Sequence, residues 1–157
     1  MRLYIIRHGE TSWNKAKRLQ GRKDIMLDAD GIRLAEKTGE GMQDIDFDLV
    51  ISSPLIRAKQ TAELVLAGRQ IPMITDKRII EMSFGKWEGE SVRESTVLPA
   101  DYVDKFYHDP YHCPKAPGGE SFQDVLNRTA DFYQSLIKNE AYRDANILIS
   151  THGAASR

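Results

Sequence analysis

The sequence predicts an α/β protein: a three-layer α/β/α sandwich with a mostly parallel central sheet. Short aliphatic segments at residues 3–6, 49–51 and 147–149 lack polar alternation, which is typical of strands covered on both faces. Segments with helical spacing of apolar residues lie between them. Strands that alternate with helices join through right-handed crossovers into a parallel sheet. The 157 residues contain no repeat or linker-like composition, so we expect one domain over residues 1–157.

Three helices are expected from their apolar spacing and end signals, at residues 30–41, 54–67 and 121–137. Ser53 and Pro54 have the composition of an N-cap and a first turn, and Gly68 ends that helix. Residues 71–75 form a weaker strand candidate, in which Pro72 predicts an edge position or a late start. Residues 91–117 contain four prolines, and we expect this irregular stretch to cover or flank a site.

The composition limits the partners and the compartment. Lys and Arg total 22 against 23 Asp and Glu, so no global basic field attracts nucleic acid or an anionic membrane. Any anion site must be built locally. Cys113 is the single cysteine and cannot form an internal disulfide. No apolar run is long enough for a signal peptide or a membrane span. We therefore expect a cytoplasmic protein.

Charged and imidazole side chains follow the predicted strands. Arg7 and His8 follow the first strand, Arg57 follows the second, and His152 follows the third. The carboxyl ends of parallel strands share one edge of the sheet, where ligands bind. Two guanidinium groups match the oxygens of a phosphoryl group, and a neutral imidazole is a nucleophile toward phosphorus. Each histidine precedes a glycine, which leaves room for a ligand near the backbone.

A phosphoryl site of this kind also needs a proton donor for the leaving group. Glu81 is the candidate, because apolar neighbours can raise the pKa of its carboxyl and keep it protonated. From the residues alone, a solvated loop carboxylate stays open as the alternative interpretation of Glu81.

The motifs resemble those of the histidine phosphatase superfamily, also called phosphoglycerate-mutase-like, and its small-metabolite phosphatase branch. The matching runs follow the family's order along nearly the whole chain, at residues 7–14, 19–22, 52–62, 81–89, 117–121 and 151–153. The resemblance implies that His8 accepts the phosphoryl group, and that Arg7, Arg57 and His152 hold its oxygens. It assigns Glu81 as the acid and then as the base for water. We expect His8 to be neutral, with its other nitrogen on a backbone carbonyl, and His152 to be a charged donor.

The same resemblance extends to the substrate. Asn14, Gln20 and Gly21 lie where family members contact the phosphate or the substrate. The mixed charges of residues 22–24 predict a solvated loop, although Arg22 is close enough to Gln20 in sequence to help hold an anion. The implied function is hydrolysis of a small phosphorylated metabolite without metal or cofactor. The family continues beyond its second histidine with a helix and a strand, so the resemblance implies that a chain ending at Arg157 lacks them.

Three other functions compete with this interpretation. A mutase would return the phosphoryl group to the product, and a non-catalytic module would only bind a phosphorylated partner. The run from His108 to Cys113 suggests a zinc hydrolase, but Pro110 disrupts the helical spacing that paired histidine ligands would use. We expect a surface loop there.

Overall fold

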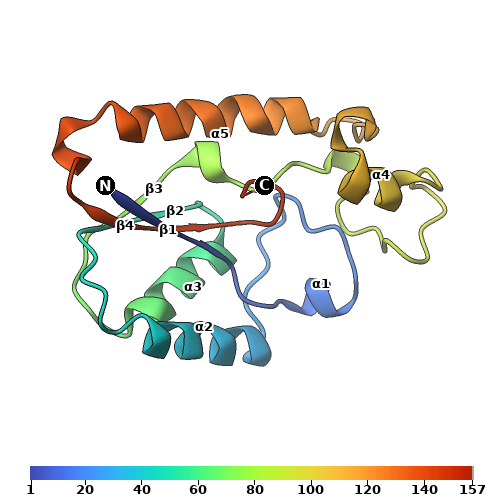
Figure 1. Ribbon diagram of the computed structural model, residues 1–157. Helices are drawn as coiled ribbons and strands as arrows, with labels where there is room; N and C mark the ends of the chain where they lie inside the picture. The colour runs from blue at the N-terminus through green and yellow to red at the C-terminus, as the bar shows by residue number, and fades with distance from the viewer. Residues whose placement is uncertain (157) are drawn as a thin grey trace.

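The fold is a parallel four-stranded sheet between two layers of helices (Figure 1). The computed structural model describes residues 1–156. The strand order is β1-β4-β2-β3 and every pair is parallel, with strands β1 (Arg2–Arg7), β2 (Leu49–Ser52), β3 (Met73–Thr75) and β4 (Asn146–Thr151). The predicted class and all four strands are confirmed. As Pro72 predicts, β3 begins after it and lies at an edge of the sheet.

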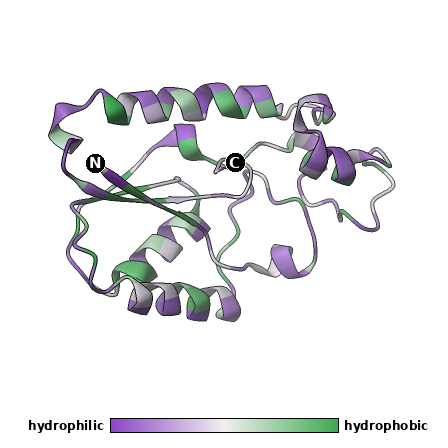
Figure 2. Ribbon diagram, in the orientation of Figure 1, coloured by the Kyte–Doolittle hydropathy of each residue, from purple (hydrophilic) through white to green (hydrophobic). Residues whose placement is uncertain are grey.

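Helices cover both faces of the sheet because alternate strand residues point to opposite sides. In β4, Leu148 packs with one group of core residues, whereas Ile147 and Ile149 pack with another. Helices α2 (Ala29–Gly41) and α3 (Ile56–Leu66) lie on one side, and α5 (Phe122–Ile137) lies on the other (Figure 1). Figure 2 shows alternating hydrophobic and hydrophilic bands along α5, as expected of a helix with one buried face.

The helix ends partly correct the predictions. Ser121 caps α5 through a capping box with Asp124. The prediction that Ser53 caps α3 is wrong, because α3 begins at Ile56 and its N-cap, Leu55, makes no side-chain hydrogen bond. The Ser53 hydroxyl instead lies 2.6 Å from His152 Nε2.

Short elements connect the layers. They are α1 (Ser12–Lys15), α4 (Tyr102–His108) and the 3₁₀ turns η1 (Lys77–Ile79), η2 (Gly85–Trp87), η3 (Pro110–His112) and η4 (Glu140–Tyr142). Helix α4 lies inside the stretch predicted to be irregular. It packs through Tyr102 against Trp87, with ring centroids 5.0 Å apart, as part of a third apolar cluster. No helix within residues 1–156 combines the length and apolar character needed to cross a membrane.

Candidate active site

A cavity of about 420 Å³ opens at the carboxyl ends of β1 and β4. Seven of the eight side chains predicted from the sequence line it: Arg7, His8, Asn14, Gln20, Gly21, Arg57 and Glu81. The eighth residue, His152, is fully buried next to His8, and their ring centroids are 5.1 Å apart. The topology therefore brings together residues that are up to 145 positions apart (from 7 to 152) in the chain.

His8 has the protonation state that a nucleophile needs. Its Nδ1 lies 2.7 Å from the carbonyl oxygen of Gly9. Because a carbonyl only accepts hydrogen bonds, Nδ1 carries the hydrogen and Nε2 keeps its lone pair. Burial, followed by the charge of Arg57, lowers the pKa of His8 to about 3. The ring is therefore neutral around pH 7, and the expected hydrogen bond to a backbone carbonyl is confirmed.

The glycines after the two histidines make room for protein groups. A Cβ atom on Gly9 would lie 2.6 Å from the carbonyl oxygen of Gly31 in α2, so Gly9 permits close packing of the loop on that helix. A Cβ atom on Gly153 would lie 3.1 Å from Cζ of Arg7. Gly153 therefore leaves space for the Arg7 guanidinium beside the cavity. The space beside Gly9 that we expected to hold a ligand is occupied by the backbone of α2.

Arg57 is held rigidly although it is a charged residue. It is fully buried, and its Nη1 and Nη2 donate to the carbonyl oxygens of Lys23 and Gly21, both at 2.8 Å. These bonds tie the loop at Gly21, which has a φ of 51°, to the start of α3. The Nε–H group has no acceptor within residues 1–156. Since Arg57 lines the cavity, an anion bound there can satisfy this buried donor.

Glu81 is buried, with 8% of its surface exposed, which rules out a solvated loop carboxylate. Its Oε1 accepts hydrogen bonds from the backbone N–H groups of Met82, at 2.8 Å, and Ala154, at 3.2 Å. Burial raises the pKa of Glu81 and outweighs these bonds and the charges of Arg57 and Arg7, which lower it. The site therefore favours the protonated carboxyl, the form that can donate a proton.

His152 differs from its expected charge state. Burial lowers its pKa, with a smaller contribution from the charge of Arg57, so the ring is neutral in the free protein. Its Nε2 lies 2.6 Å from Ser53 Oγ, and its Nδ1 has no partner within residues 1–156. Ser53 Oγ also accepts a hydrogen bond from the Leu55 N–H. Its own hydrogen can therefore be donated to Nε2, which leaves Nδ1 as an N–H donor.

Asn14 and Gln20 are oriented by a residue that the sequence analysis missed. The N–H group of the buried Thr11 donates to Asn14 Oδ1 at 3.0 Å, and its hydroxyl donates to Gln20 Oε1 at 3.0 Å. Because both amide oxygens face Thr11, the amide NH₂ groups remain as donors for a ligand in the cavity. The sequence contains a pattern that could have identified Thr11, because Thr11 and Asn14 have the spacing of a capping box. The structure contains this capping box.

Two further residues lie away from the cavity. Arg22 pairs with Glu120, at 2.8 Å, and does not line the cavity. His112 pairs with Asp109 on the exposed η3 turn. Within residues 1–156, the potential metal ligands that cluster are Glu10, Asp28 and Asp30, and the run from His108 to Cys113 is not among them.

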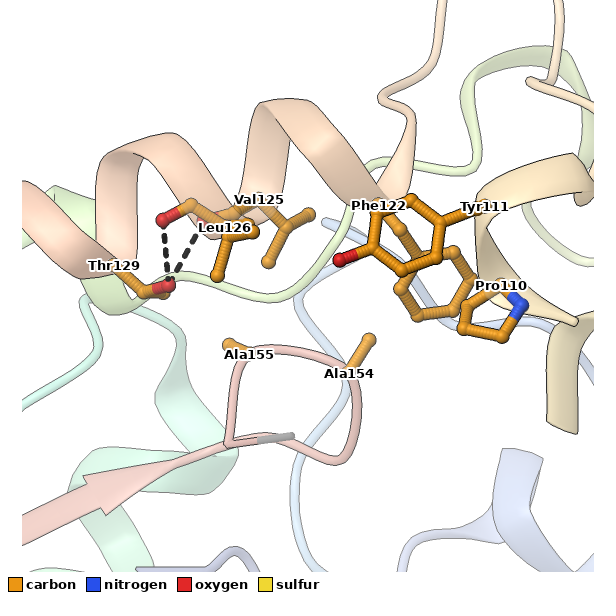
Figure 3. A pocket seen from close by; sticks show the side chains of 8 residues that line it. All are labelled: Pro110, Tyr111, Phe122, Val125, Leu126, Thr129, Ala154 and Ala155. Atoms are coloured by element: carbon orange, nitrogen blue, oxygen red, sulfur yellow. Dashed lines mark hydrogen bonds between the residues drawn. The ribbon is translucent and has the colours of Figure 1, made fainter. Parts of the chain in front are cut away.

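A second, smaller cavity of about 240 Å³ lies between α5, the η3 turn and residues 154–155 (Figure 3). Its lining contains no charged side chain. The Thr129 hydroxyl is directed to the helix carbonyl oxygens of Val125 and Leu126. Ala154 lines both cavities and donates its N–H to Glu81. The apolar cavity therefore lies next to Ala154, which hydrogen-bonds to Glu81, and it adds no reactive group to the site.

Together, the fold and the site define a class. The cavity combines two guanidinium groups, amide donors, a neutral imidazole with a free lone pair and a carboxyl whose pKa is raised by burial. This set can bind a phosphoryl group, attack its phosphorus atom and protonate the leaving oxygen. These are the requirements of a phosphoryl-transferring enzyme that uses histidine.

The comparisons with known proteins give the family. Residues 3–157 match the model of the histidine phosphatase superfamily (branch 1), and the chain belongs to this family. It is 34% identical over 151 residues to the uncharacterized phosphatase PhoE of Bacillus subtilis (strain 168), covering 96% of this chain and 71% of that protein. It is 36% identical over 152 residues to the adenosylcobalamin/alpha-ribazole phosphatase of Escherichia coli (strain K12), covering 97% and 73%.

The structural comparison agrees. The solved structure of Bacillus stearothermophilus YhfR superposes with a TM-score of 0.88 at 35% identity, covering 98% of this chain and 75% of that chain. The predicted family and fold are confirmed, and the protein is an enzyme of the histidine phosphatase and phosphoglycerate mutase type.

Proposed function

We propose that the protein hydrolyses a phosphomonoester of a small metabolite through a phosphohistidine on His8, without a metal ion. The observation that carries this proposal is the pairing of His8 Nδ1 with the Gly9 carbonyl oxygen. This hydrogen bond leaves Nε2 as the unprotonated nitrogen of a ring that lines the same cavity as Arg7 and Arg57.

In the first step, the Nε2 lone pair attacks phosphorus and the bond to the ester oxygen breaks. The Glu81 carboxyl gives its proton to the departing alkoxide, which leaves as the alcohol. The products at this stage are phosphohistidine, a Glu81 carboxylate and the alcohol. Arg7 and Arg57 stabilise the charge on the transferring oxygens, since fixed cations lower the barrier where charge is spread in the transition state.

In the second step, a water molecule attacks phosphorus and the P–N bond breaks. The Glu81 carboxylate takes one proton from that water, so inorganic phosphate leaves and both His8 and Glu81 return to their initial states. The same group acts first as acid and then as base. Its buried position supports both roles, because burial raises its pKa while the nearby Arg57 and Arg7 stabilise the carboxylate.

The neighbouring donors hold the phosphoryl oxygens in place. The amide NH₂ groups of Asn14 and Gln20 are available because Thr11 occupies their oxygens. His152 contributes the N–H at Nδ1, and Gly21 shapes the loop that Arg57 fixes. All these groups are placed before substrate arrives, so the site loses little free energy in reorganisation.

The test is phosphate release from a panel of phosphomonoesters in the presence of EDTA, beside an assay for isomerisation of 3-phosphoglycerate. We expect release that EDTA does not reduce, and no isomerisation. Loss of activity with EDTA and recovery with zinc would overturn the metal-independent mechanism. Transfer of the phosphoryl group to the second hydroxyl would indicate a mutase. Binding of phosphate without turnover of any ester would indicate a binding module.

A further inference from the structure

Part of the cavity lining has no role in the phosphoryl chemistry, and we call it the leaving-group end. Beyond the groups assigned to the phosphoryl oxygens, the cavity lining includes Lys17, Arg18, Phe84, Val92, Phe106 and Tyr107. A phosphomonoester bound at His8 must place its leaving group in the remaining space. Because these side chains share the cavity with His8 but have no role in the phosphoryl chemistry, they are the ones available to contact the alcohol part of the substrate.

The charges in this cavity exceed the needs of one phosphoryl group. Four cations line it, Arg7, Lys17, Arg18 and Arg57, against the single carboxyl of Glu81. Arg7 and Arg57 suffice for a phosphoryl dianion in the mechanism above. Within residues 1–156, neither Lys17 nor Arg18 forms an ion pair, and Arg18 directs Nη1 to the carbonyl oxygen of Gly89. Lys17 is thus an uncompensated cation at the leaving-group end.

Lys17 holds its position at some conformational cost. Its φ of 52° lies in the left-handed region, where glycine is relaxed and a residue with a Cβ is strained. Backbone hydrogen bonds fix the segment, because Val92 N–H donates to the Lys17 carbonyl oxygen at 2.9 Å and Leu19 N–H donates to that of Glu90 at 3.0 Å. A glycine at position 17 would adopt this backbone conformation with less strain. The conformation of the turn therefore does not explain why the residue is a lysine.

The neighbouring walls are apolar. The rings of Phe84 and Phe106 are 5.9 Å apart, and those of Phe106 and Tyr107 are 5.2 Å apart. Aromatic walls bind flat or apolar groups through area and ring contacts. The leaving-group end therefore combines aromatic surface with an unpaired positive charge.

We propose that the preferred substrates carry a second negative charge next to an apolar body on the leaving group, and that Lys17 selects them by binding this charge. This inference rests on the proposed function. Inorganic phosphate and uncharged alcohol esters engage only the His8 end, whereas an acid-bearing aryl phosphate engages both ends.

The test compares phenyl phosphate with 4-carboxyphenyl phosphate, which differ by one carboxylate on the leaving group. Lys17→Gln removes the charge, and Lys17→Gly removes the side chain while relaxing the backbone. We expect both variants to lower kcat/KM for the carboxylated ester about tenfold, the equivalent of one lost charge-assisted hydrogen bond. For phenyl phosphate the change should stay within about twofold, as for a contact that this ester does not make.

Two controls sharpen the comparison. Lys17→Arg keeps the charge and should recover most of the selectivity. Lys86→Gln removes an exposed lysine that does not line the cavity and should leave the ratio of the two esters unchanged.

The outcomes separate the two proposals. If Lys17→Gly changes kcat/KM equally for both esters, or changes neither, the selectivity role of Lys17 is overturned and the hydrolytic mechanism is untouched. If the wild-type protein releases phosphate from neither of these esters nor from any other ester of the panel, the proposed hydrolysis itself is overturned, and the selectivity role with it.

Discussion

The two ends of the cavity are built in different ways. At the phosphoryl end, Arg57 and His152 are fully buried, and hydrogen bonds to backbone or to Ser53 fix them. At the leaving-group end, Tyr107 is 59% exposed on the short helix α4, and Lys17 is exposed on the loop after α1. The parallel sheet thus fixes the groups that handle phosphorus, while loops and the short helix α4 line the leaving-group end. Changes at the first end should alter chemistry for every ester, and changes at the second should alter only the choice of ester.

The largest effect should follow removal of the nucleophile. We expect His8→Ala to lower kcat for all phosphomonoesters by at least about 10⁴-fold, as for loss of a group that forms the covalent intermediate. Binding of inorganic phosphate, measured by calorimetry, should persist because Arg7 and Arg57 remain. His112→Ala, on the exposed η3 turn, is the matched control and should retain full activity. Normal hydrolysis by His8→Ala would remove His8 from the mechanism.

Loss of the general acid should have the next largest effect. We expect Glu81→Gln to lower kcat by about 10²–10⁴-fold for phenyl phosphate, as for loss of a positioned proton donor. The loss should be smaller for 4-nitrophenyl phosphate, whose leaving group needs little protonation. Equal losses for both esters would show that Glu81 does not protonate the leaving oxygen.

The same carboxyl predicts a pH dependence. Hydrolysis requires protonated Glu81, whose pKa burial raises, so kcat/KM should fall as pH rises through that value. It also requires neutral His8, whose pKa is about 3, so activity should fall at acid pH only as that value is approached. After correction for ionisation of the ester, kcat/KM of the Glu81→Gln variant should no longer fall at alkaline pH. If kcat/KM of the Glu81→Gln variant still falls at alkaline pH, the titrating group is not Glu81.

A smaller effect should come from the residue that orients His152. Ser53→Ala removes the hydroxyl 2.6 Å from His152 Nε2, and we expect about tenfold weaker inhibition by inorganic phosphate, as for one misplaced donor. Ser135→Ala, which removes a hydroxyl on α5, should not change phosphate inhibition. If Ser53→Ala binds phosphate normally, then Ser53 does not determine which nitrogen of His152 carries the hydrogen.

The smallest effect should occur at the exposed wall. Tyr107→Ala should raise KM for aryl phosphates about two- to fivefold through lost ring contact, and kcat should stay within about twofold because the groups at His8 are unchanged. Inhibition by inorganic phosphate should not change. A large fall in kcat would mean that the two ends of the cavity are not separable.

The sequence predicted the features that local patterns carry. Aliphatic segments predicted all four strands, and the residues after them predicted the groups that meet at the cavity. Features that depend on distant parts of the chain were missed. The contact between Gly9 and Gly31, the role of Ser53 beside His152 and the neutral state of His152 all arise from burial and from packing between layers. Prolines in residues 91–117 indicated irregularity and so concealed α4, which begins and ends between Pro99 and Pro110.

The most direct test of the account is to trap the phosphorylated enzyme. Mixing the protein with a phosphorus-32-labelled ester and quenching in alkali within milliseconds should leave label on a peptide containing His8, stable to base and labile to acid. His8→Ala should give none, and the label should disappear at the rate of phosphate release. Phosphate release without any labelled enzyme, accompanied by inversion of configuration at phosphorus, would contradict the account, because it would show that water attacks the ester directly.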